Sequence, residues 1–321
     1  TAIWLRLSRS RQWLIPPNSR SSHVIPTPSG GGIGFVLVFM VYAYWRRHEV
    51  LPDWQGALAL VGAMLLAFVG LLDDFRNLGI RLRLVLQVVA GLVLLPFLLQ
   101  MPPLPVFQSI TIGGSWLALL LVLALLWHVN LYNFMDGIDA LAVTQALFFC
   151  LAIPLLAAAG QHSNVMLALG AAVCGFLFFN LPRAQLFMGD AGSYFLGYVL
   201  VVLALSFVRE GLLEIWTILV LAGAFVADST TTLLGRFREG AVWYHPHRTH
   251  AYQLLAVRWK SHGRVVATYM AINVFWLLPL AWLTVRKPEF GAVLSVVAVA
   301  PLMVLVHAVR RSASMQTAGA Q

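Results

Sequence analysis

Long apolar stretches separated by short polar runs recur along the whole chain. A helix rises about 1.5 Å per residue, so about 20 apolar residues cross the roughly 30 Å hydrocarbon core of a bilayer. The stretches that approach this length cover residues 30–45, 54–72, 84–99, 113–130, 140–159, 164–181, 193–208, 214–234, 265–285 and 289–309. The pattern therefore predicts an all-α, polytopic membrane helix bundle with about ten transmembrane helices.

The composition supports this prediction. Of the 321 residues, 60% are apolar and only 10% are charged, whereas about 25% are charged in soluble domains. A soluble domain of this size needs more polar residues to cover its surface, so that class is excluded. No linker marks a second domain, and one integral-membrane domain over residues 1–321 is expected. The first residues, Thr-Ala-Ile-Trp-Leu, are expected to be the tail of an eleventh, earlier helix.

The basic residues indicate which helix ends face the cytoplasm. Ten crossings place alternate polar segments on opposite sides of the membrane. One side comprises residues 1–29, 73–83, 131–139, 182–192, 235–264 and 310–321. It holds 16 of the 21 Lys and Arg residues, and cytoplasmic loops of membrane proteins carry such an excess. This side is therefore expected to be cytoplasmic, and the net charge of +9 reflects membrane topology rather than nucleic-acid binding.

The acidic residues on the same side predict a functional site. Six of the 12 Asp and Glu residues lie in these segments, and a seventh, Asp228, lies near the same end of the stretch 214–234. Five of the seven sit in short runs rich in Asn, Gly and Ser. The seven are Asp73, Asp74, Asp136, Asp139, Asp190, Asp228 and Glu239. Carboxylates at membrane depth are costly and are usually functional. Their gathering on one membrane face favours a single active site over scattered helix caps.

Two of the polar runs combine carboxylates with groups that bind metal or phosphate. In LLDDFRN, the adjacent carboxylates of Asp73 and Asp74 repel each other unless a cation or a proton lies between them. The run FMGDAGS opens a membrane helix, so Asp190 is expected beside free backbone N–H groups. The alternatives are a solvated helix end paired with Arg76 and a plain N-cap aspartate.

A third run, NLYNFMDGID, offers four hard oxygen ligands within ten residues. Its amides are Asn130 and Asn133, and its acids are Asp136 and Asp139. The members of each pair are three residues apart, a spacing that places them on one face of a helix. Such ligands suit Mg²⁺ or the ribose and base of a nucleotide. An Asx-rich turn is the alternative.

The fourth run, HPHRTH, gathers His245, His247, Arg248 and His250. Its spacing fits no common zinc site, and no cysteine is near. Beside acidic metal sites, these imidazole and guanidinium groups are interpreted as a phosphate clamp, with a solvated basic loop as the alternative. Together the four runs predict transfer between phosphate esters, in which positioning and charge neutralisation are the main catalytic devices.

Two other classes of membrane protein share some of these features. A secondary transporter also carries intramembrane carboxylates, but here most acids lie at one face and no inverted repeat is evident. A CDP-alcohol phosphotransferase is suggested by Asp-Gly-Ile-Asp-Ala at residues 136–140. The further Gly and Asp residues of that motif are absent from residues 141–160, which disfavours this class.

The runs LLDDFRN, NLYNFMDGID, FMGDAGS and HPHRTHAYQ, in this order, resemble the polyprenyl-phosphate N-acetylhexosamine-1-phosphate transferase family, glycosyltransferase family 4. The form HRTHAYQ is closer to the branch that initiates O-antigen than to the peptidoglycan enzymes, for which consecutive histidines are expected. The resemblance implies transfer of N-acetylhexosamine 1-phosphate from a UDP-sugar to undecaprenyl phosphate with release of UMP. It also implies a multi-pass protein of the bacterial inner membrane with a cytoplasmic active site, and leaves a homodimer open.

The resemblance further implies roles for individual residues. Asp190 would ligate Mg²⁺, or alternatively Mn²⁺, with Asn133 as a second ligand. Asp73 and Asp74 would lie at the lipid phosphate, with Asp73 as a candidate base. Substrate-binding residues are Arg83 at a phosphate, Asn130 and Asp136, and Asn180, Asp139 and Phe187 in the uridine pocket. His247, Arg248 and His250 would contact the pyrophosphate. One departure is Ser29, which stands where relatives usually carry Arg in P-T-P-R-G-G.

Overall fold

The computed structural model describes residues 1–10, 14–15, 26–46, 53–107, 110–158, 161–241 and 247–318. In chain order the first helices are α1 (Ala2–Ser10), α2 (Gly32–Trp45), α4 (Trp54–Arg76), α5 (Ile80–Val93), α6 (Leu95–Leu98), α7 (Gly114–Phe134), α8 (Leu141–Ala157) and α9 (Gln161–Asn180). They are followed by α10 (Gly189–Arg209), α11 (Ile215–Leu221), α12 (Gly223–Arg238), α13 (Ala251–Trp259), α14 (His262–Ile272), the π-helix η1 (Asn273–Leu277), α15 (Leu278–Arg286), the 3-10 helix η2 (Pro288–Phe290) and α16 (Gly291–Ala318).

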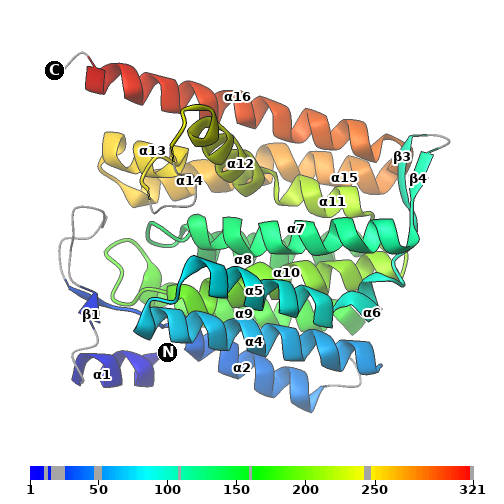
Figure 1. Cartoon of the computed structure of the whole chain (residues 1–321), viewed down its shortest axis with the longest axis horizontal. Coiled ribbons are helices and arrows are strands. Elements are labelled where there is room, and N and C mark those ends of the chain that lie inside the picture. The colour runs from blue at the N-terminus through cyan, green and yellow to red at the C-terminus, as the bar shows by residue number, and fades with distance from the viewer. Residues whose placement is uncertain are drawn as a thin grey trace.

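The long helices run side by side in one bundle, with α16 along one edge and α2 and α4 along the other (Figure 1). At the centre lies α10, whose most apolar stretch is completely buried. It packs mainly against α4 and α7. A helix that is apolar all round belongs inside a bundle, and the rings of Phe195 and Phe39, from α10 and α2, meet at 5.9 Å. This central helix carries Asp190 in its first turn.

The prediction of an all-α membrane bundle is confirmed, and each of the ten predicted stretches contains a helix. Among the described residues, six helices are long and apolar enough to cross a membrane, or seven if α11 and α12 form one bent span. Ten crossings are therefore not confirmed. One reason is that α5 ends at Val93 and Pro96 lies in the first turn of the short helix α6, so the stretch 84–99 is divided.

Two small antiparallel pairs of strands, which the apolar pattern does not indicate, flank the bundle. One joins β1 (Leu14–Ile15) to β2 (Thr27–Pro28), and the other joins β3 (Leu104–Phe107) to β4 (Ile110–Ile112). The two pairs lie at opposite ends of the bundle (Figure 1). The β3–β4 hairpin is anchored to the helices because Trp216 Nε1 donates to the Pro105 carbonyl at 2.7 Å.

A buried polar contact marks the point where the helix axis turns by 72° between α11 and α12. Gln145 Nε2 donates to the carbonyl of Leu221 at 3.2 Å, and Asn273 Nδ2 donates to Gln145 Oε1 at 2.6 Å. Both amide side chains are buried. Since both side chains are buried, these bonds provide partners for the Gln145 amide and for the Leu221 carbonyl at the bend.

We expect Gln145→Leu to lower the free energy of unfolding by about 1–3 kcal/mol, because the Leu221 carbonyl and the Asn273 amide lose their partner. Thermal unfolding in detergent measures the loss. The double variant Gln145→Leu, Asn273→Leu is the matched control, since it removes both buried amides and should recover part of the stability. A single variant as stable as the parent protein would contradict a role for this pair at the bend.

Candidate active site

The aspartates at the end of α4 and the start of α10 form the centre of the site. Asp74 Oδ1 accepts from the backbone N–H of Asp190 at 3.0 Å, and Asp74 Oδ2 accepts from that of Ala191 at 3.3 Å. The first N–H groups of a helix have no partner within the helix, so the Asp74 carboxylate caps α10. The sequence predicts these N–H groups to be free, and the structure differs because a neighbouring helix supplies their acceptor.

Gly189 is required for this contact. Its φ of +76° lies in the left-handed region, and a Cβ at this position would lie 2.6 Å from Asp74 Oδ2 and 2.9 Å from Ser29 Oγ. Only glycine lets the two segments approach so closely. Ser29, which departs from the expected Arg, therefore lies beside the aspartates, with its carbonyl bonded to Trp4 Nε1 at 2.9 Å.

The second aspartate of the pair, Asp73, is buried and fully bonded. Its Oδ2 accepts from Arg83 at 2.7 Å and from the Tyr194 hydroxyl at 3.3 Å, and its Oδ1 accepts from the Leu78 N–H at 2.7 Å. Arg83 is also 3.3 Å from the Tyr194 hydroxyl. The predicted candidate base is thus held in an ion pair by the arginine that was predicted to hold phosphate. Tyr194 was not predicted, although its position four residues after Asp190 places it on the same helix face.

The two asparagines of α7 lie near the C-terminal end of the helix. Asn133 Nδ2 donates to Asp190 Oδ1 at 2.7 Å and to Ser193 Oγ at 3.0 Å. Asn130 Nδ2 donates instead to Gln87 of α5 at 2.7 Å. The pair predicted as metal ligands, Asp190 and Asn133, is therefore in direct contact.

Asp136 lies just after α7 and completes the group of acids. Burial raises the pKa of Asp136 well above its usual value, and the negative charges of Asp190, Asp74 and Asp139 raise the pKa further. A cation among these carboxylates would relieve both effects.

Two of the residues predicted for the uridine pocket form hydrogen bonds with the backbone of neighbouring loops. Asp139 Oδ2 accepts from the backbone N–H of Arg183 at 3.0 Å and lies 3.1 Å from His262 Nδ1. Asn180 bonds through both ends of its amide, to the Ala140 N–H at 2.9 Å and the Leu186 carbonyl at 3.0 Å. These bonds shape the loops, so a contact with substrate would add to them or replace them. His262, which is remote in sequence, gave no local signal.

Phe187 and the glycine-rich segment after β2 are joined through their backbones. The N–H of Phe187 donates to the Pro28 carbonyl at 2.9 Å, and its carbonyl accepts from the Gly31 N–H at 2.9 Å. The side chain is half-buried. Its predicted stacking on uracil stays a prediction.

The described part of the fourth run lies against the end of α7. The rings of His247 and His250 stack with centroids 4.9 Å apart, and Arg248 between them is half-buried. Burial lowers the pKa of His247 to about 3, and the positive charges of His250, Arg236 and Arg310 add to this effect. His247 is therefore neutral near pH 7 in this structure. His245 lies outside the described residues.

A cavity of about 460 Å³ brings these groups together between α5, α7, α10 and the start of α13. Its polar end is lined by Arg83, Asn130, Asn133, Tyr194, His247, His250 and Gln253. Its apolar wall is formed by Ile80, Leu84, Leu123, Leu126, Trp127 and Phe134. Five predicted residues thus line one amphipathic cavity: Asn130 and Asn133 of the third run, His247 and His250 of the fourth run, and Arg83 from the resemblance.

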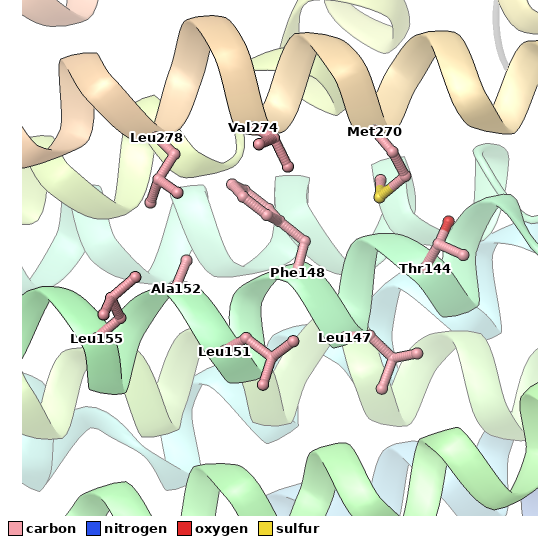
Figure 2. Close-up of a pocket in the computed structure, with 9 residues that line it drawn as sticks. All are labelled: Thr144, Leu147, Phe148, Leu151, Ala152, Leu155, Met270, Val274 and Leu278. Atoms are coloured by element: carbon pink, nitrogen blue, oxygen red, sulfur yellow. The ribbon is translucent and has the colours of Figure 1, made fainter.

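A second groove, of about 310 Å³, has a different character. It lies between α8 and the α14–α15 segment, and Figure 2 shows Phe148 and Val274 approaching each other across it. Its lining is almost entirely aliphatic or aromatic, and the hydroxyl of Thr144 donates to the Ala140 carbonyl at 2.8 Å. Without a charged group it offers no chemistry for phosphate transfer.

Asp190 and its neighbour Asn133, which lines the first cavity, fit Mg²⁺ by their donor chemistry. Carboxylate and amide oxygens are the ligands that Mg²⁺ prefers, and the charges of Asp73 and Asp74 both act on Asp190. Among the described residues, no three His, Cys, Asp or Glu side chains converge on one metal position. Asp190 would hold the ion, and Asn133 would turn its amide oxygen towards it.

Comparison with known proteins identifies the family. The model of Glycosyl transferase family 4 matches residues 57–208. A phospho-N-acetylmuramoyl-pentapeptide-transferase of Streptococcus equi subsp. zooepidemicus is 31% identical over 230 residues, which cover 65% of this chain and 66% of that relative's length. This chain belongs to glycosyl transferase family 4. The resemblance inferred from the four sequence runs is thereby confirmed.

Other relatives within glycosyl transferase family 4 carry two kinds of name. A probable undecaprenyl-phosphate N-acetylglucosaminyl 1-phosphate transferase of Bacillus subtilis is 26% identical over 271 residues, covering 82% of this chain and 73% of the relative. A phospho-N-acetylmuramoyl-pentapeptide-transferase of Chlorobium limicola is 26% identical over 317 residues, covering 84% and 83%. Both kinds of name are those of transferases.

We expect Mg²⁺ to bind more tightly as the pH rises. Because the pKa of Asp136 is raised, this carboxyl holds a proton at low pH, and a cation entering the cluster must displace it. Titration calorimetry in buffers of different ionisation enthalpy measures the protons released. Asp136→Asn is the control, since it cannot release this proton. Equal proton release from the variant and the parent protein would contradict the role of Asp136.

Proposed function

We propose that this protein transfers N-acetylhexosamine 1-phosphate from a UDP-N-acetylhexosamine to undecaprenyl phosphate and releases UMP. The observation that carries the proposal is the amphipathic cavity, in which an apolar wall leads to the end occupied by Arg83, Asn133 and the stacked histidines. A lipid phosphate needs such a wall beside its charged head. Membership of a transferase family supports the same reaction class.

The bond changes of the proposed reaction are simple. An oxygen of the lipid phosphate attacks the β-phosphorus of the UDP-sugar, and the bond from that phosphorus to the bridging oxygen breaks. UMP leaves with the bridging oxygen and its electron pair, and a lipid-linked sugar pyrophosphate forms. A phosphate monoester has a second pKa of about 6, so the attacking group is largely ionised near pH 7. A strong base is therefore not essential.

The residues of the site then act by orientation and charge. Asp73 holds the guanidinium of Arg83 at 2.7 Å, which places this cation at the polar end of the cavity for a phosphate. His247 and His250, which line the same cavity, act on the pyrophosphate together with Arg248. A bound Mg²⁺ would supply positive charge at Asp190, where two anions have to meet. Positioning and charge neutralisation account for most catalysis of phosphoryl transfer.

The proposal also covers the membrane in which the protein lies and the step that it catalyses in polysaccharide synthesis. The end of the bundle that carries the site faces the cytoplasm of a bacterial inner membrane, as the excess of Lys and Arg supports, and the ten apolar stretches are its crossings. The product would be the first lipid-linked intermediate of O-antigen or a related cell-surface polysaccharide, for which the form HRTHAYQ is the supporting feature. Peptidoglycan synthesis is the second candidate, favoured by the name of several relatives.

We expect Asp190→Ala and Asp73→Ala each to abolish Mg²⁺-dependent release of UMP from UDP-sugar and undecaprenyl phosphate. The first removes the predicted metal ligand, and the second frees Arg83 from its partner. UMP is measured by chromatography with detergent-solubilised protein, and thermal unfolding checks that each variant is folded. Glu289→Ala, an exposed acid outside the site, is the control. Full activity in either variant would remove that residue from the mechanism.

We expect an O-antigen sugar donor, such as UDP-GlcNAc or UDP-N-acetylfucosamine, to react faster than UDP-MurNAc-pentapeptide. The basis is the single histidines of HRTHAYQ in place of a run of consecutive histidines. A panel of UDP-sugars with undecaprenyl phosphate gives the order of kcat/KM. A higher kcat/KM for UDP-MurNAc-pentapeptide would favour the peptidoglycan role.

A further inference from the structure

Asp228 is a completely buried carboxylate in the middle of α12. The reaction outlined above does not use it. Five donors surround it: His250 Nδ1 at 3.3 Å, the N–H of Ala251 at 3.0 Å, the N–H of Tyr252 at 3.0 Å, the Tyr269 hydroxyl at 2.5 Å and Thr232 Oγ1 at 3.2 Å. A buried charge is tolerated only when it is satisfied in this way.

Two of these donors are the first backbone N–H groups of α13. They have no acceptor within their own helix, and a carboxylate at a helix N-terminus also interacts favourably with the helix dipole. Asp228 therefore fixes where α13 begins. Since His250 is the residue directly before this helix, the same contact fixes the backbone of His250.

The bond to Nδ1 fixes the imidazole ring of His250 as well. With Nδ1 facing Asp228, Nε2 is the ring nitrogen left for the cavity that His250 lines. The stacked ring of His247 at 4.9 Å is held by the same arrangement. A hydrogen bond at one ring nitrogen of a histidine fixes the orientation of the ring and determines whether the other nitrogen carries a proton.

Tyr252 extends this arrangement to the metal-binding end of α7. Its hydroxyl donates to the Phe134 carbonyl at 2.7 Å. Phe134 follows Asn133, which bonds Asp190 at 2.7 Å. A Cβ at Gly137 would collide with the Tyr252 hydroxyl, so the loop after α7 packs directly against the Tyr252 side chain. A single buried carboxylate thus sets the distance between the histidines and the aspartates.

We propose that Asp228 is a positioning residue of the transferase site, acting through His250 and the start of α13. It keeps Nδ1 of His250 on the buried carboxylate and presents Nε2 to the phosphate groups in the cavity. What the site binds rests on the proposed function, whereas the positioning itself rests on the contacts of Asp228.

A double-mutant cycle tests the proposal. Asp228→Asn keeps the size of the side chain but cannot accept from all of its present donors. We expect it to lower kcat/KM for UDP-GlcNAc about 10- to 100-fold. The loss should be distributed between a lower kcat and a higher KM in the same proportion as in His250→Ala. In the His250→Ala background, Asp228→Asn should lower kcat/KM by less than about threefold, because the effects of coupled residues do not add. Additive losses would overturn the proposal.

Tyr269→Phe is the matched control, because it removes one donor from the same carboxylate and leaves His250 and α13 in contact with it. We expect kcat/KM within about threefold of the parent protein. Thermal unfolding of every variant separates loss of fold from loss of position. A Tyr269→Phe variant as impaired as Asp228→Asn, at equal stability, would indicate a general structural role and overturn the proposal.

Limited trypsin cleavage provides a readout that does not need activity. Asp228→Asn releases the start of α13, so cleavage after the half-buried Arg248 should become faster, and Tyr269→Phe should leave it unchanged. Mass spectrometry of the fragment ending at Arg248 gives the rate. An unchanged rate in Asp228→Asn would overturn the proposal. Absence of UMP release from the parent protein, with faster cleavage in Asp228→Asn, would reject the proposed function and retain the positioning role.

Discussion

The structure depends on the need of buried carboxylates for hydrogen-bond donors. At the end of an apolar bundle few donors are available, and the chain obtains most of them from helix starts and loops. Asp74 caps α10, Asp228 caps α13, and Asp139 accepts from the backbone of the loop before α10. Asp73 alone relies mainly on a cation, Arg83. Because each acceptor has donors on another element, these bonds set the helix ends relative to one another with an accuracy that apolar packing alone does not provide.

Much of this arrangement could be predicted from local sequence. Each of the ten apolar stretches contains a helix, whereas α1 and α13 lie outside these stretches. The excess of Lys and Arg on one side indicated which ends belong together. The resemblance implied Asn133 and Asp190 as ligands of one metal ion, and their side chains lie 2.7 Å apart. The four polar runs were informative because so few charged residues compete with them in a chain that is only 10% charged. In this setting an aspartate at a helix end is a strong signal.

The remaining features depend on partners that are distant in sequence. The bend between α11 and α12 is supported by Gln145, which lies 76 residues before its partner Leu221. Asn273, which bonds Gln145, lies 128 residues after it. The division of residues 84–99 follows from a turn before Pro96. That Asn180 and Asp139 bond loop backbone, and that His262 approaches Asp139, could not be read from the motifs that contain them. A motif indicates residue types that suit a chemistry, whereas the fold decides which of their atoms are already bonded.

The capping of α10 by Asp74 reverses the usual charge preference of a helix start. An uncapped helix N-terminus attracts anions, but here two of its N–H groups are bonded to a carboxylate, and Asp190 adds a further acid in the first turn. A phosphate without a counterion would meet the charges of two acids at this point. In the proposed reaction the nucleotide would therefore have to enter with its charge already neutralised, as a metal salt would be, because of one side chain at the end of the neighbouring helix.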